Sequence, residues 1–117
     1  MNPGGKGANQ AVASSKMGAE TYMIGAIGCD IFGQACYESL EKYGCSVQFV
    51  KKILKKPTGI ASIWVIEYDN RILLDAGANY GIEEEYVVSV LEKNAGKGDI
   101  LVAQLEIKQE VVESAFK

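Results

Sequence analysis

Residues 3–44 read PGGKGANQAVASSKMGAETYMIGAIGCDIFGQACYESLEKYG, and this stretch predicts the class of the fold. A glycine loop at 3–7 leads into an alanine-rich segment, 8–17, that reads as a helix. The short apolar run 21–27 reads as a buried strand. The amphipathic run 31–43 reads as a second helix that ends at a glycine, with Ile31, Ala35, Cys36 and Leu40 near one face. A helix, a strand and a helix in such close succession indicate an α/β fold.

The remainder of the chain adds a different element in its middle. Residues 47–54 predict a strand, and two β-rich runs, 58–68 and 71–75, predict a hairpin that turns at Asp69-Asn70. Further on, the sequence predicts a helix at 83–94, a buried strand at 99–105 and a last helix at 108–117. We therefore expect one unit, a partial three-layer, doubly wound (Rossmann-like) α/β sheet with an inserted β-hairpin at 58–76.

The predicted elements do not complete such a sheet. No strand is predicted ahead of the glycine loop, and the last predicted helix leads into no further strand. A sheet built from these segments would hold about two or three central strands, against the usual five or six. The expectation is a fragment of a larger fold. By area scaling, a compact chain of this size would expose about 6,200 Å², against about 18,300 Å² when unfolded.

Composition excludes several classes of function. The 117 residues carry 12 basic and 15 acidic side chains, a net charge of −3, with no dense basic cluster, which argues against nucleic acid and anionic membranes as partners. The chain has no histidine, so neither a catalytic histidine nor a histidine-ligated metal is available. Three cysteines without CxxC spacing, Cys29, Cys36 and Cys45, predict reduced and mostly buried thiols in a cytoplasm.

The glycine loop is the first candidate site. A glycine-rich loop at the start of a helix lets backbone N–H groups and a lysine approach a polar ligand. The loop lacks the Walker pattern because Gly7, not serine or threonine, follows Lys6. The dinucleotide pattern GxGxxG also fails, since Gln10 occupies the place of its last glycine. A purely structural turn remains the alternative.

Three acidic residues and the hairpin are the other candidates. Glu106 lies at the end of the predicted strand 99–105, where open α/β sheets bind their ligands and where a carboxylate can accept hydrogen bonds from sugar hydroxyls. Taken alone, a carboxylate at this place is more commonly a solvated acid at the end of a strand. Asp30 is expected to cap the helix that follows it, and Asp75 has no identifiable partner. The apolar hairpin could be a lid, a dimer surface or an ordinary edge hairpin.

In combination, these motifs resemble the ribokinase-like (PfkB) family of carbohydrate kinases. The run NPGGKGANQAVA at 2–13 is similar to the first family signature, and GAIGCDIFG at 25–33 to the glycine-acid turn that follows it. PTGIA at 57–61 and GAN at 77–79 resemble the two ends of a lid hairpin, and QLE at 104–106 resembles a strand end that contacts the sugar. The motifs occur in family order along the whole chain.

The resemblance implies a role for each matching residue. Gly5, Lys6 and Asn9 would hold sugar hydroxyls, Glu106 would accept a hydrogen bond from one, and Ala61 and Ile72 would pack the lid against the sugar. Family members transfer a phosphoryl group from ATP to a sugar hydroxyl with Mg²⁺ and often K⁺, and the lid commonly forms a homodimer contact.

The resemblance also implies what this chain does not carry. The family's catalytic aspartate, in a Gly-Ala-Gly-Asp motif, and its nucleotide pocket have no counterpart in the sequence, so we expect no catalytic residue, no protein-bound metal and no cofactor on this chain alone. The expected function is that of the sugar-binding segment of a kinase for ribose or a similar sugar, inactive by itself. The alternative is a stand-alone sugar-binding or dimerising module without kinase activity.

Overall fold

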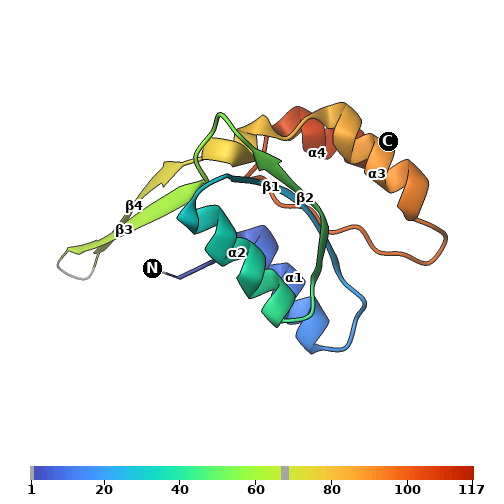
Figure 1. Cartoon of the computed structure of the whole chain (residues 1–117), viewed down its shortest axis with the longest axis horizontal. Coiled ribbons are helices and arrows are strands. Elements are labelled where there is room, and N and C mark those ends of the chain that lie inside the picture. Colours follow the sequence, from blue (N-terminus) through green and yellow to red (C-terminus); the bar gives the residue numbers. More distant parts are fainter. Residues whose placement is uncertain (1, 67–68) are drawn as a thin grey trace.

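The computed structural model of the chain describes residues 2–66 and 69–117 and has a mixed α/β architecture (Figure 1). The two sheets within these residues each have two strands, one parallel pair and one antiparallel pair. In chain order the elements are α1 (Lys6–Lys16), β1 (Tyr22–Gly28), α2 (Ile31–Lys42), β2 (Ser46–Ile53), β3 (Ile60–Ile66), β4 (Asp69–Asp75), the 3₁₀ helix η1 (Gly77–Gly81), α3 (Glu84–Asn94) and α4 (Gln109–Ala115). None of the described helices is long and apolar enough to cross a membrane.

The parallel pair β1–β2 lies between two groups of helices. The α2 helix connects the two strands, whose register runs from Tyr22 opposite Ser46 to Gly28 opposite Ile53. Figure 1 shows α1 and α2 on one face of this pair and α3 and α4 on the other. One buried cluster joins Ala11, Leu40, Cys45 and Val47. A second joins Ala26, Ala78, Ile82, Val87 and Val111. Helices therefore cover both faces of β1–β2, and the α/β class predicted from the sequence is confirmed.

The antiparallel pair β3–β4 projects away from the rest of the chain as a ribbon (Figure 1). Its register runs from Ile60 opposite Asp75 to Ile66 opposite Asp69, which confirms the predicted hairpin. The predicted turn is wrong in its position, because Asp69 and Asn70 belong to β4. The prediction of a strand through Tyr68 lies outside the described residues.

The predicted buried strand at 99–105 is wrong. The structure assigns no strand there, and the apolar side chains are exposed, by 88% at Ile100 and 76% at Leu105. Strand-forming residues still need a neighbouring backbone for their N–H and C=O groups, and within the described residues β1 pairs with β2 alone. The open segment and the projecting hairpin help explain an accessible area of 8,368 Å², well above the ~6,200 Å² of a compact chain.

Two smaller predictions fail at the beginning of α2. Ile31, expected on the packed face of the helix, is 77% exposed, and Cys29, expected to be buried, is exposed as well. Both flank Asp30, whose carboxylate accepts a 2.8 Å hydrogen bond from the Gly33 N–H and so caps α2 as predicted. The turn that contains Cys29 and Ile31 lies beyond the end of β1, so β1 does not cover these two side chains.

The cap also holds the base of the hairpin, at a cluster that we call the hairpin junction: Gly28, Asp30, Gly33 and Thr58. Asp30 Oδ1 accepts from the Thr58 hydroxyl at 2.6 Å, and Asp30 Oδ2 accepts from the Thr58 N–H at 2.8 Å. Thr58 Oγ1 in turn accepts from the Gly28 N–H at 2.9 Å. Thr58 is 6% exposed, so these bonds tie the end of β1, the start of α2 and the base of the hairpin together inside the protein.

The junction predicts a strong effect of Thr58→Val. Valine keeps the shape of the side chain but leaves the buried Gly28 N–H without its acceptor and Asp30 Oδ1 without the hydroxyl donor. We expect a loss of about 1–3 kcal/mol in the free energy of unfolding, measured by urea denaturation followed by circular dichroism. Thr58→Ser, which retains the hydroxyl, is the control and should lose less. Equal losses in the two variants would contradict the role of the hydroxyl.

The junction also predicts a dependence of stability on pH. Hydrogen bonds from the side chain and the N–H of Thr58 and from the Gly33 N–H hold the pKa of Asp30 below its ordinary value of 3.8. A carboxyl whose pKa is lower in the folded state stabilises the fold above its unfolded pKa, and this contribution disappears as the pH falls through the folded pKa.

We therefore expect the difference in stability between the wild type and Asp30→Asn to be present at pH 6 and to shrink below pH 3.8. Urea midpoints measured from pH 6 to pH 2.5 test this. A difference that stays constant across that range would show that the charge of Asp30 does not stabilise the junction.

Candidate functional site

The glycine loop leads directly into the N-terminus of α1. Gly5 precedes the helix with φ at 101°, a conformation that favours glycine, and glycine has no side chain with which to cap the helix. Its carbonyl accepts the first helical hydrogen bond, from the Asn9 N–H at 2.9 Å. The first turn of α1 has no acidic residue to interact with the positive end of the helix dipole. The loop therefore presents N–H donors and a positive potential, and an acceptor with negative charge from elsewhere in the chain can bind there.

Glu106, a hundred residues further along, supplies that group. Its Oε2 accepts a 2.9 Å hydrogen bond from the Lys6 N–H, and its Oε1 lies 3.6 Å from Lys6 Nζ. The Lys6 side chain is 72% exposed, so this ion pair is weak and the backbone hydrogen bond is the firmer contact. A Cβ on Gly5 would lie 3.5 Å from Glu106 Oε2, on a backbone already in the left-handed region. That distance is an ordinary contact, so the backbone conformation, and not a lack of space, favours glycine at this position.

The other three predicted site residues lie in two places. Asn9 is exposed on α1, about one turn beyond Gly5, near enough to the loop that its Oδ1 would lie 3.9 Å from a Cβ on Gly4. Ala61 and Ile72 are on the hairpin, where alternation along each strand places both on one face of the ribbon. Ile72 is 58% exposed, so the hairpin does not bury it against the glycine loop in this structure.

The loop cluster carries the groups that a hydroxyl-rich ligand needs. A carboxylate accepts hydrogen bonds, an ammonium donates them, and an amide does both. Metal chemistry has less support: no group of three or more Cys, Asp or Glu side chains in the described part of the chain could hold a metal ion. The described residues thus offer no site made of protein side chains alone for the Mg²⁺ that the family resemblance implies.

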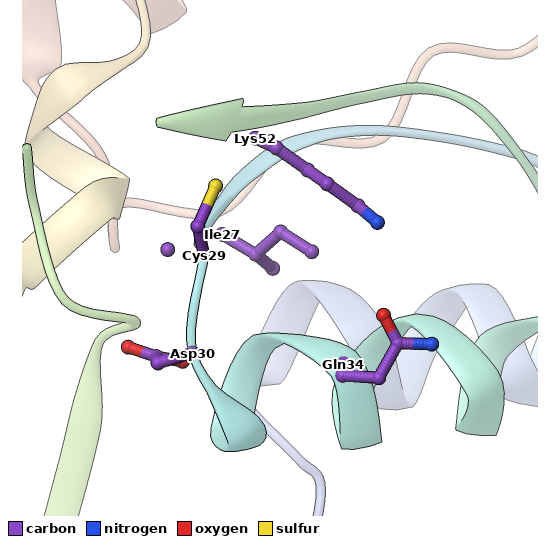
Figure 2. A pocket seen from close by; sticks show the side chains of 6 residues that line it. Ile27, Cys29, Asp30, Gln34 and Lys52 are labelled. Atoms are coloured by element: carbon purple, nitrogen blue, oxygen red, sulfur yellow. The ribbon is translucent and has the colours of Figure 1, made fainter. Parts of the chain in front are cut away.

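A separate pocket lies elsewhere, between the ends of β1 and β2 and the start of α2 (Figure 2). Its volume is about 300 Å³, and its lining includes Cys29, Asp30, Gln34 and Lys52 but none of the predicted sugar-binding residues. Figure 2 shows the Asp30 carboxylate turned away from Lys52, toward the segment that leads into the hairpin, where it binds Thr58. Lys52 Nζ lies 4.8 Å from the centre of the Tyr37 ring. Two of the charged groups at this pocket are thus already engaged with neighbours.

Sequence reasoning missed Thr58 and the amide pair Gln10–Gln104. Gln104 Nε2 donates to Gln10 Oε1 at 3.0 Å, although 94 residues separate them. A signal existed for Thr58, since a threonine between proline and glycine ahead of a strand commonly organises a turn. No local pattern identifies two glutamines that meet across the fold.

The chain is similar to known proteins both in sequence and in structure. The family described as pfkB family carbohydrate kinase matches residues 1–117. The ribokinase of Bacillus subtilis is 37% identical over 115 residues, which cover 98% of this chain and 39% of the relative. The crystal structure of ribokinase from Thermotoga maritima has a TM-score of 0.81 and 35% identity, covering 95% of this chain and 36% of that chain. The structure of Arabidopsis thaliana ribokinase complexed with ribose and ATP has a TM-score of 0.66 and 32% identity, covering 73% and 31%.

The chain thus spans less than two fifths of the length of these relatives. The similarity nevertheless extends over almost all of the present sequence, in the family match, in sequence identity and in three-dimensional structure. Together with the glycine loop, the hairpin and the acid at the loop, it establishes that this chain belongs to the pfkB family of carbohydrate kinases.

Proposed function

We propose that this chain is the sugar-binding segment of a ribokinase-like kinase that phosphorylates ribose or a similar sugar with ATP. In this proposal residues 1–117 form a single partial domain of the ribokinase-like, three-layer type, and residues 58–76 are its lid hairpin. The observation that carries the proposal is the contact of Glu106 with the Lys6 N–H, which gathers acceptors and donors at the glycine loop. The names of the relatives, among them a ribokinase solved with ribose and ATP, support the choice of substrate.

Each predicted residue has a defined task in this proposal. Gly5 leaves room for the sugar next to the loop, while Lys6 and Asn9 hold its hydroxyls. Glu106 accepts a hydrogen bond from another hydroxyl through Oε1, whose present contact with Lys6 Nζ is long, at 3.6 Å. Oε2 can meanwhile keep the Lys6 N–H. Closure of the hairpin would bring Ala61 and Ile72 over the sugar and exclude water.

Phosphoryl transfer itself needs more than this segment offers. The reaction depends on positioning of the phosphoryl donor and on stabilisation of the charge that develops on the transferred group. We assign no catalytic residue to this chain, and ATP is the phosphoryl donor of the kinase as a whole. The expected activity of the isolated chain is sugar binding without phosphorylation.

A thermal melt with and without D-ribose tests this proposal. We expect ribose to raise the midpoint of the 117-residue chain, because a ligand at 100 times its Kd adds about 2.7 kcal/mol of stability. Glu106→Gln and Asn9→Ala should each raise the Kd for ribose by about 5-fold to 150-fold, since each leaves a sugar hydroxyl without its partner. Titration calorimetry gives the Kd of each variant.

The matched control is Glu92→Gln, the same substitution at an exposed site on α3. It should leave the ribose response unchanged. A wild-type chain that melts cooperatively but is indifferent to ribose would refute the proposal for this chain. Ribose affinity unchanged in Glu106→Gln would refute the role of that residue.

We further propose that the chain forms a homodimer through the hairpin. The side chains of Ile60, Trp64 and Leu73 lie on the ribbon face opposite Ala61 and Ile72, and they are 50%, 60% and 71% exposed. Apolar side chains grouped in this way on a projecting ribbon are typical of an interaction surface. A second copy of the same ribbon would cover this face and leave the other free for the sugar.

Leu73→Glu tests the dimer, because it places a charge in the middle of the proposed contact. We expect sedimentation velocity to show a dimer for the wild type at tens of micromolar and a monomer for the variant. Leu54→Glu, at a residue that is 87% exposed in the turn after β2, is the matched control and should remain dimeric. Wild-type sedimentation as a monomer would refute the proposal.

A further inference from the structure

The segment that carries Glu106 is fixed to α1 by side chains rather than by a β-ladder. Residues 99–105 form no strand, so no pattern of backbone hydrogen bonds sets their register against the rest of the chain. On the far side of Glu106, Ile107 packs against the buried cluster around Ala78 and Val87. On the near side, the Gln104 side chain donates to Gln10 at 3.0 Å. Glu106 thus lies between an apolar attachment and a polar one.

The two polar contacts join the same two stretches of the chain, the first turns of α1 and residues 104–106. Lys6 and Gln10 are four residues apart on α1, which places them on one face of the helix, separated by a rise of about 6 Å. Their partners, Glu106 and Gln104, are two residues apart, and Leu105 and Glu106 belong to a turn. A shift of one residue along the segment would therefore break both contacts together, so the amide pair defines which residue meets the Lys6 N–H.

We propose that Gln10 and Gln104 are a positioning pair that sets the register of Glu106 against the glycine loop and thereby tunes sugar affinity. Neither residue is proposed to touch the sugar. The inference rests on the proposed function only for its effect on affinity, since the register of Glu106 is a property of the sugar-free chain.

Substitution of glutamine by glutamate tests the pair selectively. An amide can rotate to donate or accept, so each single variant, Gln10→Glu or Gln104→Glu, can keep a hydrogen bond with the remaining amide. The double variant places two carboxylates opposite each other, and because both are acceptors with the same charge, the hydrogen bond is lost. We expect the single variants to behave like the wild type and the double variant to differ by far more than their sum. The neutral variant Gln104→Met separates the lost hydrogen bond from the added charge.

The primary readout is the Lys6 amide in ¹⁵N-resolved NMR spectra, because its proton bonds directly to Glu106 Oε2. In the double variant and in Gln104→Met, we expect its proton resonance to move upfield and its protection from hydrogen exchange to fall. The second readout is the Kd for ribose, which should rise about twofold to tenfold in both variants. Gln48→Glu, at an exposed position on β2, controls for charge and should change neither readout.

The outcomes separate this inference from the proposed function. A Lys6 amide unchanged in both the double variant and Gln104→Met would overturn the positioning pair, whatever the ribose affinity. If the Lys6 amide changes in these variants while the wild-type chain binds no ribose, the result would support the positioning pair and refute the sugar-binding proposal. A changed amide with an unchanged Kd for ribose would overturn the claim that the pair tunes affinity.

Discussion

The Asp30 carboxylate is the interaction on which the arrangement of this chain most depends. It caps α2 through the Gly33 N–H and at the same time accepts both the hydroxyl and the N–H of Thr58. The contact is close enough to require glycine nearby: a Cβ on Gly28 would lie 2.5 Å from the Thr58 nitrogen and 2.6 Å from the Lys56 carbonyl oxygen. One side chain therefore fixes where the hairpin leaves the parallel pair, and hence the direction in which Ala61 and Ile72 are presented.

Because the parallel pair has only two strands, its stability comes from the helices on its two faces. Isolated two-stranded sheets are marginal in water, and packing of apolar faces is what makes them persist. Here one cluster fills the space under α1 and α2, and the other fills the space under η1, α3 and α4. The α3 helix is further held at the edge of β2, where Tyr86 Oη donates to the Phe49 carbonyl and Lys51 Nζ lies 2.8 Å from Glu83 Oε2. The glycine loop and the hairpin thus extend from a body whose layers support each other.

Local signals made most of this fold predictable. Glycine stops, the cap at Asp30 and short apolar runs predicted β1, α2 and β2 within a residue or two, and two β-rich runs predicted the β3–β4 hairpin. Predictions failed where the burial or the strand pairing of a residue depends on its neighbours in three dimensions. Ile31 is an apolar residue, which favours burial, but it lies exposed in the first turn of α2. Residues 99–105 have the amino-acid composition of a strand but have no pairing partner among the described residues. The site followed the same division, since the acid at 106 was predictable and its contact with the Lys6 N–H was not.

The unpaired segment has a consequence for the site. In a sheet, the ladder fixes the height of every residue along a strand, so a residue at the strand end is positioned by many bonds at once. Glu106 has no such ladder before it, and its carboxylate is held by one backbone hydrogen bond, a long ion pair and the neighbouring amide contact. Few contacts mean that each one matters more to the position of the carboxylate. The position of Glu106 therefore depends on a few contacts of side chains, while the position of the hairpin depends on the buried hydrogen bonds of Thr58.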